Sequence, residues 1–225
     1  MRPRGSRSEA VEARTALRLA RKEKRQEGRR EGILDAARRV LAANGLEGLT
    51  LGAVASEADL SKPALHYYFP TREDLVGALT ADYLSREADA VIAAVHAAKT
   101  DRGAAEAALR AKVAFAAADL QGFRVAYVLP LVVTLPRELT VSRVYPPGIR
   151  TMDALSERLA RVELAKGLSP RKLANLCFCL AQGVLSLVSG LAAIGGATKF
   201  PLDELTDEAC ALLASAMKAP RKLRG

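Results

Sequence analysis

The chain has 225 residues, of which 50% are apolar and 26% are charged, and this composition excludes an intrinsically disordered protein. Three cysteines, an odd number, argue against a disulfide scaffold and favour a reducing compartment. The formal net charge of +9 is uneven, because residues 1–30 carry +7 and residues 31–225 only +2.

The basic N-terminus, residues 1–26, is predicted to be a flexible arm, with a helix from Ala10 onward as the alternative. A polycationic segment is expected where a protein meets a polyanion, either nucleic acid or an anionic membrane; the alternative is a solvated tail that only aids solubility. No apolar run follows the arginines, so a signal peptide is not expected and the predicted location is cytoplasmic.

Apolar residues at helical spacing begin the folded part of the chain. They predict one face of a first helix, which Asn44-Gly45 would end; its members are Ile33, Leu34, Ala37, Val40 and Leu41.

Three helices with N-cap signals follow, of which the first two are short and the last is long. Thr50 is the expected N-cap of the first of them, and Asp59-Leu60 forms a brief turn after it. Ser61 caps the next, which runs to Phe69 with Pro63 in its first turn, where proline is tolerated. Thr71 opens the last, and Thr71-x-x-Asp74 is a variant of the capping box.

The rest of the chain shows no strand alternation and no repeat. Prolines 130, 136, 146 and 147 predict kinks or loops between its helices. Those helices are expected near 102–120, 121–134, 147–166, 170–195 and 203–218. The predicted fold class is therefore all-α.

Residues 173–198 contain no charged side chain and are long enough to span a bilayer. Polar side chains interrupt the segment, and small residues recur in it at steps of three and four: Gly183, Ser186, Gly190, Ala193 and Ala197. Such a stripe lets another helix approach closely. We interpret the segment as a central or intersubunit helix; a membrane anchor is the alternative.

The short helices from Thr50 to Phe69 match a helix-turn-helix unit in length and spacing. The second helix is poor core material but offers hydroxyls, a cation, an imidazole and flat rings from Ser61, Lys62, Ala64, His66, Tyr67 and Tyr68. Side chains of these kinds bind phosphates and read bases.

At this point the sequence resembles the TetR family of transcriptional regulators. The resemblance covers residues 29–76 and is densest at Thr50-x3-Val54-Ala55 and at Leu60-Ser61-Lys62-Pro63-x-Leu65-x-Tyr67-Tyr68-Phe69. Three positions depart from the family pattern. Asp59 stands where glycine is usual, His66 where tyrosine is frequent, and Arg72 where lysine is frequent.

The resemblance implies a three-helix DNA-binding domain over residues 27–87, with its helix-turn-helix at about 50–69. It also implies that the chain binds double-stranded DNA at an inverted-repeat operator. The residues expected at the DNA are Thr50, Ser61, Lys62, Pro63, Ala64, His66, Tyr67, Tyr68 and Arg72. Core packing is the alternative role for Tyr67 and Tyr68.

The resemblance further implies that residues 88–219 form a larger helical domain, which binds a small molecule and makes the protein a homodimer; residues 220–225 would be a basic tail. Pocket candidates for a largely apolar effector are Phe115, Phe123, Tyr127, Leu131, Met152 and Phe178. The expected dimer contacts are Gly183, Ser186, Gly190, Ala193, Leu205 and Leu212. Ordinary core packing is the alternative for each pocket candidate.

Catalytic and metal motifs are not evident. Cys177-x-Cys179 would place its two thiols on different faces of a helix, so neither a zinc site nor a cofactor is expected. The sequence thus predicts a regulator, most simply a repressor released by a small molecule. The alternatives are a helical small-molecule-binding or catalytic protein that binds no DNA, and a membrane-anchored regulator.

Overall fold

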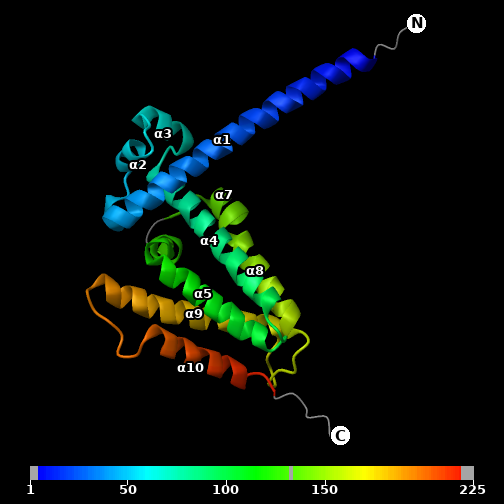
Figure 1. Ribbon diagram of the computed structural model, residues 1–225, viewed down its shortest axis with the longest axis vertical. Coiled ribbons are helices and arrows are strands. Elements are labelled where there is room, and N and C mark those ends of the chain that lie inside the picture. Colours follow the sequence, from blue (N-terminus) through cyan, green and yellow to red (C-terminus); the bar gives the residue numbers. More distant parts are fainter. Residues whose placement is uncertain (1–4, 132–133, 219–225) are drawn as a thin grey trace. The chain divides into compact units, whose positions relative to one another are not determined.

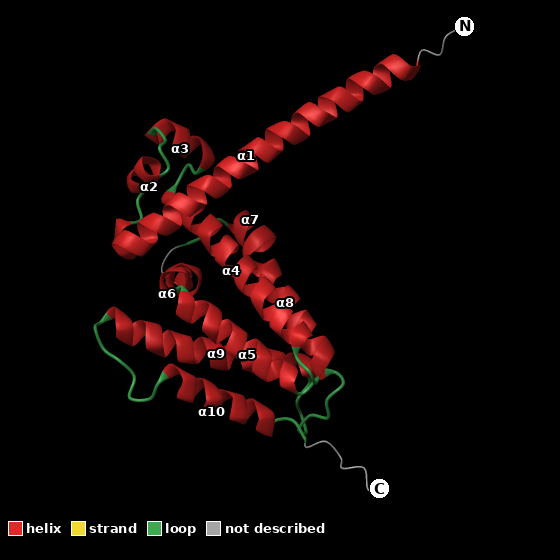
Figure 2. Ribbon diagram, viewed as in Figure 1, coloured by secondary structure: helices red, strands yellow, loops and turns green. Residues whose placement is uncertain are grey.

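The computed structural model describes residues 5–131 and 134–218, and every regular element among them is a helix (Figure 2). The chain divides into two compact units, residues 1–75 and 76–225. This division and the domain boundary expected at residue 87 both fall inside one helix, Arg72–Ala97. The predicted basic tail, residues 220–225, lies outside the described residues.

The first unit contains α1 (Gly5–Gly48), α2 (Leu51–Glu57), α3 (Lys62–Tyr68) and the start of α4 (Arg72–Ala97). α2 and α3 lie beside the C-terminal part of α1 (Figure 1). α1 is continuous from Gly5, so within the described residues the expected flexible arm is the N-terminal extension of the first helix. Gly45 adopts a positive φ of 66° and kinks α1 at the predicted stop.

The core of the first unit matches the predicted apolar face. Ile33, Ala37, Val40 and Leu41 of α1 are buried, whereas Leu34 is only half-buried. The other buried apolar side chains of this core come from the short helices and their connections: Leu49, Val54, Ala55, Leu65, Phe69 and Leu75. Helices as short as α2 and α3 depend on this burial, because seven residues cannot form a stable helix in isolation.

Side-chain caps fix where the short helices begin. The hydroxyl of Thr50 accepts from the backbone N–H of Ala53 at 3.1 Å, and that of Ser61 accepts from Ala64 at 3.3 Å. At α4 the capping box is complete. The Asp74 N–H donates to the Thr71 hydroxyl at 3.1 Å, while the Asp74 carboxylate accepts from the Thr71 N–H at 3.1 Å. The predicted caps are therefore confirmed.

The second unit holds the rest of α4 and all later helices. Their bounds are α5 (Gly103–Ala118), α6 (Leu120–Phe123), η1 (Arg124–Val128), η2 (Leu129–Leu131), α7 (Arg137–Leu139), η3 (Thr140–Val144), α8 (Tyr145–Leu159), α9 (Pro170–Ala193) and α10 (Leu202–Ser215). The predicted helix at 121–134 is broken into α6, η1 and η2. The one at 147–166 begins earlier and ends at Leu159, with Pro146 and Pro147 in its first turn.

α9 lies at the centre of the second unit, packed against α5, α8 and α10 (Figure 1). One face of α9 is buried, through Leu173, Cys177, Ala181 and Leu185. α5 is rich in alanine on its buried face, and small side chains there let neighbouring helices approach closely.

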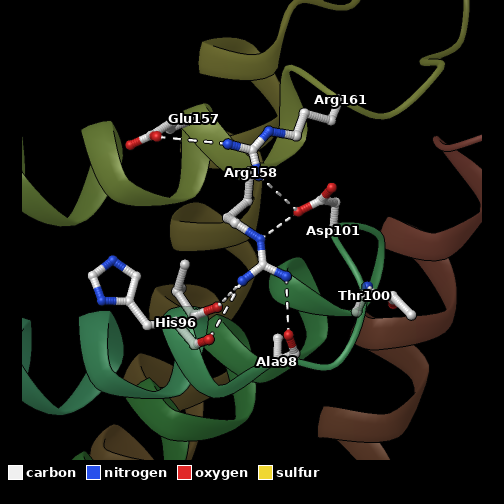
Figure 3. A network of polar contacts seen from close by, with 9 residues as sticks. His96, Ala98, Thr100, Asp101, Glu157, Arg158 and Arg161 are labelled. Atoms are coloured by element: carbon white, nitrogen blue, oxygen red, sulfur yellow. Dashed lines mark hydrogen bonds and ion pairs between the residues drawn. The ribbon is translucent and has the colours of Figure 1, made fainter.

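Arg158 joins the end of α8 to the end of α4 (Figure 3). Its guanidinium donates to the carbonyls of Val95 and Ala98, both at 2.9 Å, and forms an ion pair with Asp101. Carbonyls at a helix C-terminus lack partners within the helix. Arg158 therefore satisfies the end of α4 and fixes the connection to α5.

We expect Arg158→Met to lower the free energy of unfolding by about 2–3 kcal/mol, because methionine keeps part of the stem but none of the charged donors. Urea denaturation followed by circular dichroism measures the change. Arg161→Met is the matched control. Arg161 is 61% exposed and meets Asp101 only at 3.7 Å, so its loss should cost no more than about 0.5 kcal/mol. Equal effects at the two positions would contradict this role of Arg158.

Candidate nucleic-acid interface and effector cavity

The connection between α2 and α3 is a tight turn with one left-handed residue. Asp59 has φ 54° and is the only non-glycine residue with positive φ in the described part of the chain. The N–H of Leu60 donates to the carbonyl of Ala55 at 2.9 Å, which closes the end of α2. Aspartate tolerates this conformation, so the departure from glycine at Asp59 leaves the turn intact.

α3 has a buried side and an exposed side. Leu65 within α3 and Phe69 at its C-cap are completely buried and hold the helix on the first unit. Lys62, His66 and Tyr67 lie on the exposed side, with Tyr67 69% exposed. A short, well-anchored helix that presents polar side chains outward is the arrangement that helix-turn-helix proteins use in the major groove.

The predicted DNA-binding positions at the helix starts lie together. Ser61 and Pro63 are exposed at the start of α3, and Ala64 behind them is half-buried. The stem of Lys62 passes over Gly52 of α2, 3.7 Å from the position that a Cβ would take. Thr50 is exposed at the start of the same helix. One surface therefore carries Thr50, Ser61 and Lys62.

His66 and the two tyrosines complete this surface. The Nδ1 of His66 lies 3.2 Å from the carbonyl of Pro70, which only accepts, so a neutral ring carries its proton on Nδ1 and leaves Nε2 as an acceptor. Tyr67 and Tyr68 pack edge to face at 5.1 Å. Tyr68 is half-buried, whereas Tyr67 projects outward, so core packing is not the role of Tyr67.

Two arginines stabilise the backbone beneath this surface by donating hydrogen bonds to carbonyl groups. Arg72, expected at a phosphate, donates to the carbonyls of Leu49 at 2.9 Å and Leu46 at 3.1 Å, so it fixes the segment before Thr50. Arg30, which sequence reasoning missed, donates to the carbonyl of Tyr68 at 2.9 Å and lies over the Phe69 ring. The signal for Arg30 was weak, since it stands in a run of many basic residues.

The second unit contains a buried ion pair that the sequence analysis also missed. Lys112 of α5 and Glu87 of α4 have side chains only 3% and 5% exposed, and the Lys112 Nζ donates to Glu87 at 2.8 Å. Tyr127 joins them: its hydroxyl donates to Glu87 at 2.5 Å and accepts from Lys112 at 2.9 Å. Each of the two charged residues has the same helical spacing as the buried apolar residues of its helix. This spacing is the feature of the sequence that could have revealed a buried pair.

Burial and the ion pair have opposite effects on the pKa of Lys112. Desolvation lowers the pKa of the Lys112 ammonium, and the nearby Glu87 carboxylate counteracts that shift. Burial, and then the charge of Glu87, raises the pKa of Tyr127 far above its usual value, so its hydroxyl stays protonated. The ammonium also lies 4.2 Å from the centroid of the Tyr127 ring and 4.0 Å from that of Phe178, where aromatic faces stabilise a cation.

The predicted pocket residues fall into three groups. Met152 and Phe178 line a small cavity of about 10 Å³, room for about one water molecule, together with Lys112, Glu87 and apolar side chains of α5, α8 and α9. Phe115, Phe123 and Tyr127 form an aromatic cluster around Tyr83, with ring centroids 5.1 to 6.3 Å apart. Leu131 is 82% exposed and lies away from both.

The residues expected at a dimer contact occupy the outer face of α9 and part of α10. Gly183, Ser186, Gly190 and Ala193 are all exposed, and nothing among the described residues lies within 4 Å of a Cβ built on either glycine. On α10, Leu212 is 61% exposed and Leu205 is half-buried. α9 is also long and apolar enough to cross a membrane, by length and composition alone.

The cysteines are free thiols in separate surroundings. Burial raises the pKa of Cys177 to about 12, so this thiol stays protonated, and it donates to the carbonyl of Ala105 at 3.4 Å. Cys179 is exposed on the next face of α9. Within residues 5–131 and 134–218 no three histidine, cysteine or acidic side chains are placed to hold a metal ion.

Comparison with known proteins identifies relatives of this architecture. The profile of the family described as bacterial regulatory proteins, tetR family, matches residues 33–79, from the middle of α1 into α4. The HTH-type transcriptional regulator BetI of Rhizobium meliloti (strain 1021) is 29% identical over 163 residues, which cover 72% of this chain and 75% of that protein.

Two further matches agree. The HTH-type nicotine-responsive transcriptional repressor HdnoR of Paenarthrobacter nicotinovorans is 38% identical over 58 residues, 26% of this chain and 30% of that protein. A solved structure of a protein of unknown function from Rhodococcus sp. RHA1 has a TM-score of 0.66 at 26% identity, covering 84% of this chain and 95% of that one.

Proposed function

We propose that the chain is a DNA-binding transcriptional regulator of the TetR family, a cytoplasmic homodimeric repressor that leaves an inverted-repeat operator when a small molecule binds its second unit. The observation that carries the proposal is the exposed side of α3, held outward by Leu65 and Phe69. HdnoR, which is similar over 58 residues, is a nicotine-responsive repressor by name, which supports both repression and response to a small molecule.

The exposed side chains of α3 make different contacts with DNA, some to base edges and some to phosphates. Lys62 donates to base-edge acceptors or to phosphate, and the Nε2 of a neutral His66 accepts from an amino group of adenine or cytosine. The Tyr67 hydroxyl, which accepts from Gln26 at 3.1 Å, keeps its own proton for a phosphate oxygen. Thr50 and Ser61 add phosphate contacts at the helix starts.

The small cavity beside Lys112 would have to widen to admit an effector, and its lining favours an uncharged and largely apolar molecule with one acceptor oxygen, such as a carbonyl. Two of the three N–H groups of Lys112 donate to Glu87 and Tyr127, and the third has no acceptor among the described residues. Lys112 lines the cavity, whose other walls are mostly apolar. Since Lys112 and Glu87 neutralise one another, a neutral ligand adds no unpaired charge to a buried site.

The outer face of α9 supports dimerisation. Leu176, Leu187 and Ile194 are exposed beside the small-residue stripe, at 46%, 51% and 80%. An apolar face of this extent on one helix marks an interaction surface. A second copy that covers it accounts for the membrane-like composition of α9, and two α3 helices would then read two half-sites about one helical turn apart.

The test is selection of bound fragments from the source genome, followed by gel-shift titration. We expect the wild type to prefer an inverted repeat over a scrambled duplex of equal length at moderate salt. Equal affinity for the two would contradict the proposal and would favour a helical protein that binds a small molecule without DNA. Recovery of the protein in the membrane fraction would instead favour the membrane-anchored alternative.

Lys62→Ala should weaken operator binding by about 30-fold or more, because a dimer loses two contacts of about 1–3 kcal/mol each. His66→Ala should change the ranking of operator variants rather than abolish binding. Lys166→Ala, which removes an exposed lysine from the second unit, is the control and should bind as the parent does. If Lys62→Ala retains parental affinity, α3 does not enter the groove as described.

A further inference from the structure

The N-terminal extension of α1 carries its basic residues on one face. They recur at steps of three and four, and all are exposed: Arg14, Arg18, Arg21, Lys22, Arg25 and Arg29. We refer to these six side chains as the basic stripe. At 1.5 Å per residue, the stripe from Arg14 to Arg29 is about 22 Å long.

Acidic residues of the same helix lie elsewhere on its surface. Glu23, Glu27 and Glu31 recur at steps of four, and Glu27 follows Arg25 by two residues, about 200° around the helix axis. If the helix served only solubility, glutamate placed four residues from lysine or arginine would increase its stability. The extension instead places arginine four residues from arginine, as in Arg14–Arg18 and Arg25–Arg29.

This arrangement costs helix stability in the free protein, since like charges four residues apart repel. No member of the basic stripe forms an ion pair with another described residue. A polyanion laid along the stripe removes the repulsion and supplies the missing counter-charges. The charge pattern therefore fits a linear anionic partner better than a solvated tail.

The basic stripe continues from the DNA-reading surface of the same unit. Gln26 donates to the Tyr67 hydroxyl at 3.1 Å, and Arg30 donates to the Tyr68 carbonyl at 2.9 Å, so the end of α3 is fixed against this part of α1. Five members of the stripe surround an open groove that Tyr68 also lines; they are Arg18, Arg21, Lys22, Arg25 and Arg29. From there α1 extends beyond α3 (Figure 1).

We infer that the basic stripe binds the phosphate backbone of duplex DNA outside the half-site that α3 reads. This inference rests on the proposed DNA binding by α3. At 3.4 Å per base pair, a stripe of about 22 Å follows about six base pairs of flanking duplex on each side of the operator. The contacts are to phosphates, so they lengthen the footprint without adding sequence preference.

The first experiment measures affinity against duplex length. The operator core is placed between random flanks of 0, 4, 8 and 12 base pairs. Wild-type affinity should rise as the flanks lengthen to about six base pairs and then level off. The triple variant Arg18→Gln, Lys22→Gln, Arg25→Gln should bind the bare core as the wild type does and gain clearly less affinity from the flanks, since it lacks three of the six charges of the stripe.

The second experiment compares two matched substitutions. Lys22→Gln removes a charge from the basic stripe, and Lys24→Gln removes the same charge two residues away, off the stripe; both side chains are exposed. On an operator with long flanks, Lys22→Gln should reduce the slope of log affinity against log salt by about 1.8 per dimer, or 0.9 for each lost phosphate contact. Lys24→Gln should leave the slope unchanged.

Three outcomes overturn the inference. Equal changes of slope in Lys22→Gln and Lys24→Gln would mean that only overall charge counts. A triple variant that keeps the gain from flanking DNA would exclude the stripe as the contact. Flank-independent DNA affinity, with stripe-dependent binding to phosphatidylserine vesicles, would assign the stripe to a membrane surface. A wild type that does not distinguish operator from scrambled duplex would instead overturn the proposed function itself.

Discussion

Lys112→Met should lower the free energy of unfolding by about 3–5 kcal/mol, because it leaves the Glu87 carboxylate buried without its counter-ion. Methionine has nearly the length of the lysine stem. The loss of stability therefore reflects the missing charge and hydrogen bonds more than a change in side-chain volume. Denaturation in urea, followed by circular dichroism, measures the change. The slope with denaturant should stay that of the parent if the variant folds in the same way.

The double variant Glu87→Gln, Lys112→Met is the control for this experiment. It removes both charges, and buried pairs replaced together by neutral groups are often nearly neutral in stability. We expect it to regain most of the loss, with a coupling energy of several kcal/mol between the two positions. Additive effects of the two substitutions would show that Lys112 and Glu87 do not interact in solution as they do in the structure.

Gly190→Glu should dissociate the dimer and weaken operator binding by about 1,000-fold, which corresponds to roughly 4 kcal/mol for two carboxylates buried in one symmetric contact. The fold of the protomer should tolerate the change, since a Cβ at Gly190 meets nothing within 4 Å among the described residues. Sedimentation velocity measures the association, and gel shift measures the operator affinity.

Gly148→Glu in α8 is the matched control for the dimer, because a Cβ there also meets no described atom within 4 Å. It should sediment and bind DNA as the parent does. If Gly190→Glu remains dimeric, the outer face of α9 is not the contact between copies. If it is monomeric yet binds the operator with parental affinity, the two half-sites are not read by one dimer.

Local signals were sufficient to predict where the short helices of the first unit begin and how they are joined. The hydroxyl caps at Thr50 and Ser61, the capping box at Thr71 and Asp74, and the tolerance of aspartate for the left-handed turn each depend on residues fewer than four apart. The roles of these residues in folding could therefore be deduced from the sequence. Their contacts with DNA remain predictions that the experiments above address.

Tertiary contacts decided what the sequence did not reveal. Lys112 and Glu87 stand 25 residues apart, and only the packing of α5 against α4 makes them partners. Arg72 is expected at a phosphate, and the sequence did not reveal that two of its five N–H groups donate to carbonyls more than twenty residues away. The wide turns at Arg124–Val128 and Thr140–Val144 follow from packing and leave no periodic signal of their own.

The neutral balance of Lys112 and Glu87 has a consequence for selectivity among effectors. A weak acid enters such a cavity at least cost in its protonated form, so its apparent affinity falls about tenfold for each pH unit above its own pKa. An ester of the same carbon chain escapes this penalty, because it has no proton to lose. Under the proposed function, this site would therefore distinguish an acid from its ester through acidity, even where their shapes are nearly the same.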